Sequence, residues 1–496
     1  VHKNEIQTQH QHELEFSSLD VMPNSPNVHW ISSSPTFIPA SVSITPCIGY
    51  SLNNIPSHPN WAENFQIPWE KMPATLMKAL HEEKRPNPPD RRQFVRIVVD
   101  EMRQHCLNPP KKECEIIVKA IVQAHSKCFA DFSDESEFIG CGYHSLLKQF
   151  KARVENLNRN ASFGRLRAKK TPRLDYSENQ ESGQPQTRKS RSPVDTYGCV
   201  NWQPIILPEG ETEETLEAKR VYMTELYSRE GLNGADKSLI DDLMKVTYYT
   251  QRCTINAEPA QPISEIITQW PFLSLYKYMD EHFNELTNIA LHSHLNDTLV
   301  RKSPRILKYF HSLQNSKQAI QELINEITVA SEDIKTTENV TFTGVILLLM
   351  AHFHEKTDSI FLLVDVMASK EDIESSVELP ETPRLIVQGD SILSGAKWML
   401  SIEGKVICQL TCTHANFVSG LAALFASYYI FHFQYEEGAA MTLEFIQRYL
   451  VGINPDTGTK CAQSTAISKK TGEIVMRRRD AVNPNVLTLI NKINSI

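Results

Sequence analysis

A cysteine pair followed by a histidine is the first feature of this sequence that could do chemistry, because thiolates and imidazoles bind zinc. Cys408-Gln-Leu-Thr-Cys412 precedes His414. A structural zinc site needs four ligands, usually in two close pairs, and no second close cysteine pair follows. Both thiols end an apolar, strand-like run, so we expect core cysteines, no metal and no cofactor. The four cysteines between Cys106 and Cys141, with His144, are spaced too evenly to predict close pairs.

A serine motif is the second candidate. Gly389-Asp390-Ser391-Ile392 follows the apolar run Leu385-Ile386-Val387 and matches the nucleophile block of GDSL-type esterases. A serine nucleophile requires a histidine base and an acid that orients it. Those enzymes place an Asp-x-x-His block far downstream, and none occurs between Ser391 and the last residue. We interpret the motif as a turn after a strand and rank an esterase third among the functional hypotheses.

A basic segment is the strongest candidate for function. Residues 148–193 hold twelve Lys or Arg and four acidic residues, whereas the whole chain has a formal charge of −8. Lysine and arginine clusters contact phosphates and can also direct nuclear import. An equally weighted alternative is a solvated linker that its charge keeps extended. The candidate polyanion-binding residues are Lys148, Lys151, Arg153, Arg165, Arg167, Lys169, Lys170, Arg188, Lys189 and Arg191.

The composition is that of an ordinary globular protein. The 496 residues are 41% hydrophobic and 22% charged, enough for two or three domains with sizeable cores. Scattered cysteines and the absence of a visible signal peptide predict a reduced, intracellular protein, nuclear or cytoplasmic and not secreted. The apolar run 417–433 contains serines and a histidine, so we expect a buried core helix and no membrane span. No phosphate-binding glycine motif is present.

Hydrophobic periodicity predicts a mainly helical α+β protein. Apolar residues recur at i, i+3, i+4 and i+7 in four stretches between residues 65 and 158, with Pro-rich breaks between them. A hairpin with glycine at its turn is predicted at residues 397–410. The expected organisation is a disordered tail (1–64), a four-helix domain (65–158), a basic flexible linker (159–206), a helical hairpin (207–256), an α+β domain (257–452) and a C-terminal hairpin with a short helix (453–496).

Several sequence blocks resemble a known family. They are Ile67-Pro68-Trp69 through Lys84-Arg85-Pro86, Arg91 to Arg96, Gly142 to Leu146, Trp270-Pro271-Phe272-Leu273, Leu379 to Arg384 and Gly452-Ile453-Asn454-Pro455. Together they resemble the vertebrate family of sterile alpha motif domain-containing protein 3-like proteins, over roughly residues 65–485. Residues 1–64 do not show the five-helix pattern of the sterile alpha motif itself. The resemblance implies an intracellular protein that acts by binding, and it assigns no catalytic residues.

The sequence therefore predicts a non-enzymatic scaffold or adaptor protein without cofactor or small-molecule substrate. The alternative is a nucleic-acid-associated nuclear regulator that uses residues 148–193. Phosphate contacts lose affinity steeply with salt, so the salt dependence of DNA or RNA binding separates the two hypotheses.

Overall fold

The computed structural model describes residues 61–134, 136–159, 202–234, 236–313, 318–331, 337–410, 416–456, 458–461, 465–467, 474–476 and 480–496. Most of the expected tail and most of the expected basic linker lie outside these residues. The described part is mainly helical with one small mixed sheet, which confirms the α+β fold class.

The first helices enclose a hydrophobic core of their own. They are α1 (Ala74–His81), α2 (Pro88–His105), α3 (Lys111–Ala124), α4 (Ser126–Phe129) and α5 (His144–Arg159). Phe94 of α2 stacks on Phe129, with ring centroids 4.5 Å apart, and packs beside Phe150 of α5. These three aromatic rings are fully buried, so they join α2 and α5, which the sequence predicted, to the short α4, which it did not predict.

An asparagine side chain caps the start of α2. The helix begins at Pro88, and the side chain of Asn87 accepts a hydrogen bond from the backbone N of Asp90 at 2.8 Å. Proline is suited to the first helical turn because the N–H that it lacks has no partner inside the helix. Asn87 is therefore the cap.

A second helical group begins at residue 213. It consists of α6 (Glu213–Gly234), α7 (Lys237–Val246), α8 (Tyr248–Ile255) and α9 (Ile263–Gln269). The helix α6 is interrupted near its end, where Gly231 adopts φ 71°. Only glycine takes up this left-handed conformation without a steric cost.

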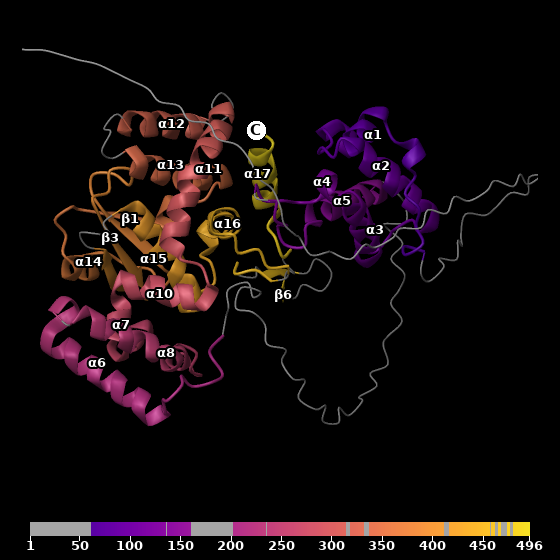
Figure 1. Cartoon of the computed structure of the whole chain (residues 1–496). Helices are drawn as coiled ribbons and strands as arrows, with labels where there is room; N and C mark the ends of the chain where they lie inside the picture. Colours follow the sequence, from indigo (N-terminus) through magenta and orange to yellow (C-terminus); the bar gives the residue numbers. More distant parts are fainter. Residues whose placement is uncertain are drawn as a thin grey trace, which may run out of the picture. The chain divides into compact units, whose positions relative to one another are not determined.

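The largest core joins helices to a four-stranded sheet. Its helices include α10 (Tyr276–Thr287), α11 (Leu291–Leu313), α12 (Gln318–Ala330), α13 (Thr337–Phe353) and α15 (Phe417–Ile430). Every residue of α15 is buried, and the helix packs between α10 and the sheet (Figure 1). This confirms the expected buried core helix. No described helix is long and apolar enough to cross a membrane.

The sheet has the order β1-β2-β3-β4. Its strands are β1 (Phe361–Val364), β2 (Arg384–Gln388), β3 (Lys397–Ile402) and β4 (Lys405–Leu410). β1 runs parallel to β2, with α14 (Lys370–Ser376) in the connection, and the remaining pairs are antiparallel. The expected β3–β4 hairpin is confirmed, and its turn residues Glu403 and Gly404 both have positive φ, 50° and 72°. Two positive φ values are typical of the tight turn that matches strand twist.

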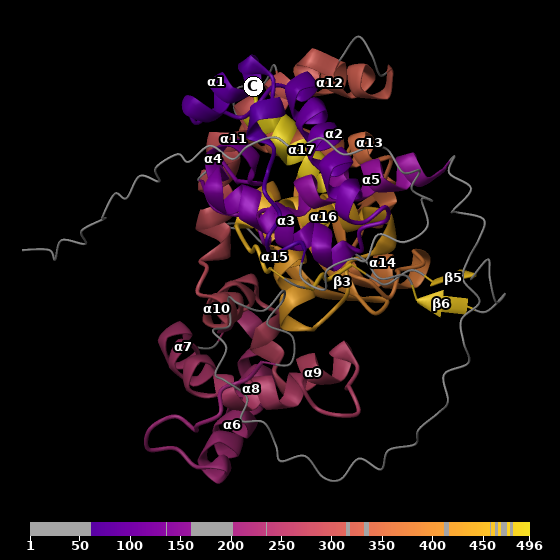
Figure 2. The same cartoon turned by 90° about the vertical axis from the view of Figure 1, so that its right-hand side faces the viewer.

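The C-terminal segment returns to helices. α16 (Ala440–Phe445) continues into a π-helical turn (Ile446–Val451), and α17 (Pro484–Asn494) lies between α16 and α5, both of which it contacts (Figures 1 and 2). The expected second hairpin is present as β5 (Thr465–Ile467) paired with β6 (Ile474–Met476). π-helical turns are rare and are found often near functional sites.

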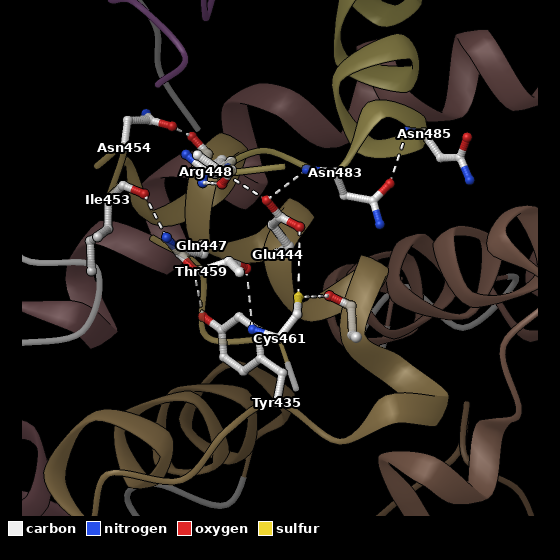
Figure 3. Close-up of polar contacts among 12 residues, drawn as sticks. Tyr435, Glu444, Gln447, Arg448, Ile453, Asn454, Thr459, Cys461, Asn483 and Asn485 are labelled. Carbon is white, nitrogen blue, oxygen red and sulfur yellow. Dashed lines mark hydrogen bonds and ion pairs between the residues drawn. The ribbon is translucent and has the colours of Figure 1, made fainter. Parts of the chain in front are cut away.

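A buried ion pair ties the π-helical turn to the start of α17 (Figure 3). Glu444 and Arg448 are 2% and 1% exposed, and Arg448 Nε donates to Glu444 Oε1 at 2.9 Å. The same carboxylate oxygen accepts from the backbone N of Asn483, the N-cap of α17, at 3.1 Å. Cys461 Sγ lies 3.7 Å from Glu444 Oε2. A buried carboxylate with several donors thus fixes where α17 begins.

A buried arginine joins the second helical group to α15. Arg252 is fully buried and donates from Nε to the carbonyl of Trp202 at 3.0 Å and from Nη1 to that of Ile430 at 2.9 Å. Its other neighbours include two histidine rings, His282 Nε2 at 3.4 Å and His432 Nε2 at 3.0 Å. Burial, followed by the charge of Arg252, holds the pKa of His282 well below its ordinary value and lowers that of His432 to about 3.

These histidines predict that the protein loses stability in mild acid. Each is neutral in the folded state and titrates near pH 6.5 in the unfolded chain, so the unfolded state binds more protons as the pH falls below that value. The free energy of unfolding should decrease by about 1.4 kcal/mol per pH unit for each histidine. Urea denaturation between pH 7.5 and about 5 measures this loss.

The double variant His282→Gln/His432→Gln should flatten this pH dependence. His81→Gln removes an exposed histidine and serves as the control that leaves the dependence unchanged. If the free energy of unfolding of the double variant fell with pH as steeply as that of the wild type, His282 and His432 would not be the groups responsible.

Candidate anion-binding pocket

Three of the ten candidate polyanion-binding residues lie in the described part, all on α5. Lys148 is exposed. Lys151 Nζ donates to the carbonyl of Pro109 at 3.3 Å, and Arg153 Nη2 donates to the carboxylate of Asp100 at 3.1 Å. Arg165, Arg167, Lys169, Lys170, Arg188, Lys189 and Arg191 lie outside the described residues. Of the three described residues, Arg153 lines a pocket.

That pocket has a volume of about 840 Å³ and lies where α2, α5 and α17 meet. Six of its lining residues are Lys or Arg, and none of the described lining residues is acidic. The polar lining residues are Arg85, Asn87, Arg91, Arg92, Arg96, Ser145, Gln149, Arg153, Asn156, Thr488, Asn491, Lys492 and Ser495. A cavity lined in this way favours an anionic ligand.

Arg91 is the buried cation of the pocket. It occupies the inward position of α2 three residues before Phe94, and it is 7% exposed. Its Nε donates to Gln149 Oε1 at 3.1 Å and its Nη2 to Ser145 Oγ at 3.0 Å. The third nitrogen, Nη1, is buried and has no hydrogen-bond acceptor among the described residues. Burial, together with the charge of Arg85, lowers the pKa of Arg91 to about 10, so the group remains charged at neutral pH.

Asp131 is the carboxylate behind the pocket. It is fully buried, its Oδ2 accepts from the backbone N of Ser145 at 2.8 Å, and its Oδ1 accepts from the hydroxyl of the same serine. Arg85 Nη2 lies 3.8 Å from Asp131 Oδ1, and Asn491 Nδ2 of α17 approaches that oxygen at 3.4 Å. One carboxylate therefore holds the first turn of α5, the chain before α2, and α17.

The other cations of the pocket are more accessible. Arg153 pairs with Asp100, but its Nε is buried and has no acceptor among the described residues. Arg92, Arg96 and Lys492 are exposed and form no ion pair within the described part of the chain. Among the described residues, two carboxylates thus form ion pairs with two of the six cations of the lining, and the other four cations form none.

This arrangement has a free-energy cost in the unliganded protein. A buried donor without an acceptor costs about 1–3 kcal/mol, and desolvation of a guanidinium adds to this cost. An anion in the pocket would be attracted by the cations that line it, and charge-assisted hydrogen bonds are about twice as strong as neutral ones. The geometry is therefore suited to binding a negatively charged group.

A second pocket, of about 910 Å³, lies at the other side of the start of α5. It contains Cys141 and His144, whose Sγ and Nδ1 atoms are 3.0 Å apart, so the sequence expectation that these residues form no close pair is wrong. The positive φ values of Gly140 and Gly142, 60° and 74°, fold the chain back and bring the two side chains together.

The Cys141–His144 pair is not an activated nucleophile. Burial raises the pKa of the Cys141 thiol and lowers that of the His144 imidazole, so both groups are neutral near pH 7. A cysteine nucleophile instead needs a lowered thiol pKa, commonly beside a protonated histidine. No group of three His, Cys, Asp or Glu side chains within the described residues could hold a metal ion.

The remaining sequence motifs have local structural roles. The Ser391 hydroxyl lies 2.9 Å from that of Ser394 and accepts from the Ser394 backbone N, in an exposed turn after β2. Cys408 is buried in β4, and burial raises its pKa to about 12, as expected for a core thiol. Cys412 and His414 lie outside the described residues.

Sequence reasoning missed most of the pocket. One signal was present in α2, where Arg91 occupies a position of the apolar stripe that carries Phe94 and Val98. A basic residue at an inward helical position is rare unless its charge is used. Nothing in the sequence connected Lys492 with α2, because only the packing of α17 brings them together.

The role of Asp131 predicts a specific stability pattern. Asp131→Asn should lower the free energy of unfolding by about 3 kcal/mol, because Arg85 and Arg91 would then lack a nearby buried carboxylate. Adding Arg91→Met should recover part of this loss, since the buried charge disappears. Urea denaturation of the single and double variants forms the thermodynamic cycle. Strictly additive effects would show that Asp131 does not stabilise Arg91.

Comparison with known proteins agrees with the family resemblance. Residues 216–275 match the family model described as sterile alpha motif domain-containing protein 3, helical domain. The match runs from within α6 to just before α10 and includes the Trp270-Pro271-Phe272-Leu273 block. No curated protein and no solved structure shows significant similarity to the chain. Residues 216–275 thus carry the helical domain of the sterile alpha motif domain-containing protein 3 family.

Proposed function

We propose that this chain is a non-enzymatic scaffold or adaptor protein that holds an acidic partner at the pocket between α2, α5 and α17. The observation that carries the proposal is the buried, charged side chain of Arg91, whose Nη1 has no acceptor among the described residues. A protein that retains such a group at the expense of stability gains from binding an anion there.

A protein partner is favoured over nucleic acid by the distribution of charge. The chain as a whole has a formal charge of −8, which repels a long polyanion outside the basic pocket and the basic segment. The cations of the pocket also line a recess, which a single protruding group can enter. Proteins that bind nucleic acid without base contacts instead have many accessible cations spread along the path of the phosphate backbone.

Neither the Ser391 motif nor the Cys141–His144 pair forms an activated nucleophile within the described residues, which supports a binding role. Within the described residues, the Ser391 hydroxyl has hydrogen-bond partners only in Ser394, whereas a serine hydrolase requires a histidine base within hydrogen-bond reach. The neutral Cys141–His144 pair lacks the thiolate that cysteine enzymes use. Both motifs are therefore assigned no catalytic role in this proposal.

The proposal predicts that acidic ligands lose affinity when the accessible cations of the pocket are removed. Arg92→Gln/Arg96→Gln/Lys492→Gln should weaken binding of a labelled poly-glutamate peptide by about tenfold, because three accessible cations are neutralised. Fluorescence anisotropy over a salt series measures the change. Lys112→Gln, an exposed cation of α3, is the control and should bind as the wild type does.

The basic segment is tested in parallel with Arg165→Gln/Arg167→Gln/Lys169→Gln/Lys170→Gln and a DNA duplex. If the chain is an adaptor, the peptide should bind more tightly than the duplex. The triple pocket variant should then weaken peptide binding more than the quadruple variant of the basic segment does. Tighter duplex binding would favour the nucleic-acid regulator. In that case, the slope of log affinity against log salt concentration should fall by about one unit in the segment variant for each phosphate interaction removed. No effect of either variant would refute the proposed function.

A further inference from the structure

We infer that the group recognised in the α2–α5–α17 pocket is a phosphate monoester, carried by a phosphorylated side chain of the partner protein. This inference rests on the proposed function and narrows it from an acidic partner to one chemical group.

The charge around the pocket favours a dianion. Asp131 and Asp100 are the carboxylates in ion pairs with lining residues, and their partners are Arg85 and Arg153. The remaining four cations of the lining are Arg91, Arg92, Arg96 and Lys492. A carboxylate brings one negative charge, whereas a phosphate monoester brings nearly two at neutral pH. The excess positive charge is thus matched better by the phosphate.

The directions of the donors favour a tetrahedral group. Guanidinium groups of α2 and of α5 line the pocket, and α17 adds the ammonium group of Lys492, so cationic donors come from three different helices. Gln149 uses its carbonyl oxygen to accept from Arg91, which leaves its amide N–H groups to donate. A carboxylate offers two oxygens in one plane, whereas the three terminal oxygens of a phosphate can accept from several directions.

The enclosure of the site favours a monoester over the diester of a nucleic-acid backbone. A monoester is attached through one oxygen, so its three terminal oxygens can enter a recess. A diester is continued by sugar on both sides and carries one charge, and it is usually bound along an open groove. Clusters of arginine that accept phosphorylated side chains are a recurring mode of protein recognition.

Calorimetric titration of the full chain tests the inference with three versions of one peptide, which carry phosphoserine, glutamate or serine at the same position. The phosphoserine peptide should bind at least tenfold more tightly than the glutamate peptide, and the serine peptide should bind least. Inorganic phosphate alone should raise the thermal midpoint of unfolding and should compete with the phosphopeptide.

The pH dependence provides an independent readout. The second ionisation of a phosphate monoester lies near pH ~6, so affinity for the phosphopeptide should rise between pH ~5.5 and ~7.5. The glutamate peptide is already ionised in this range and should show little change.

Two variants locate the effect in the pocket. Arg91→Met should reduce affinity for the phosphopeptide by at least tenfold, and Arg153→Gln, at a less buried position, should do so without loss of the fold. Arg229→Met is the matched control: it makes the same arginine-to-methionine change at an exposed position of α6, and affinity for the phosphopeptide should stay unchanged. The thermal midpoint of each variant shows that the protein tested is folded.

The outcomes separate this inference from the proposed function. Equal affinity for the phosphoserine and glutamate peptides would overturn the phosphate assignment and leave the acidic-partner proposal standing. If none of the acidic probes binds, both are wrong. If a DNA duplex displaces the phosphopeptide and binds more tightly, the partner is nucleic acid and the inference fails. Loss of affinity in both pocket variants, but not in Arg229→Met, would support it.

Discussion

The organisation of the candidate site depends on one buried carboxylate, Asp131. It accepts hydrogen bonds from the first turn of α5, faces Arg85 ahead of α2, and is approached by Asn491 of α17. A charged group with no exposed surface is stable in a protein only when donors surround it, so these three parts of the chain must converge on it. The basic pocket is the surface that this convergence leaves open. Among its cations, Arg85 is held directly by an ion pair with Asp131.

α17 is the element that completes the pocket, and its own position is fixed by a second buried carboxylate. Glu444 accepts from Arg448 within the π-helical turn and from the backbone of Asn483, where α17 begins (Figure 3). Val486, Ile490 and Ile493 then bury α17 in the large core. A polar anchor thus sets the register of the helix and hydrophobic burial supplies its stability. Lys492 and Asn491 reach the pocket as a consequence of both.

The two pockets beside the start of α5 differ in their chemistry. On one side, cations exceed carboxylates and a guanidinium nitrogen is buried without an acceptor among the described residues. On the other side, Cys141 and His144 form a close pair that burial keeps neutral. Close approach of reactive residue types is therefore not sufficient for reactivity, because the local environment decides their protonation. The charged pocket, which contains no typical nucleophile–base pair, has the stronger functional signal.

The amino-acid sequence by itself determined the local structure of this protein. Periodic apolar residues predicted the helices around Phe94 and Phe150, the length and composition of residues 417–433 predicted a buried helix, and Gly404 predicted the turn between β3 and β4. These features depend on neighbours within a few residues, where helical and strand periods and backbone sterics act. The family resemblance was likewise recognisable in the sequence and agrees with the match over residues 216–275. Only the tertiary structure decided the site, because Arg91, Asp131 and Asn491 come from distant segments and interact through burial that no local pattern encodes.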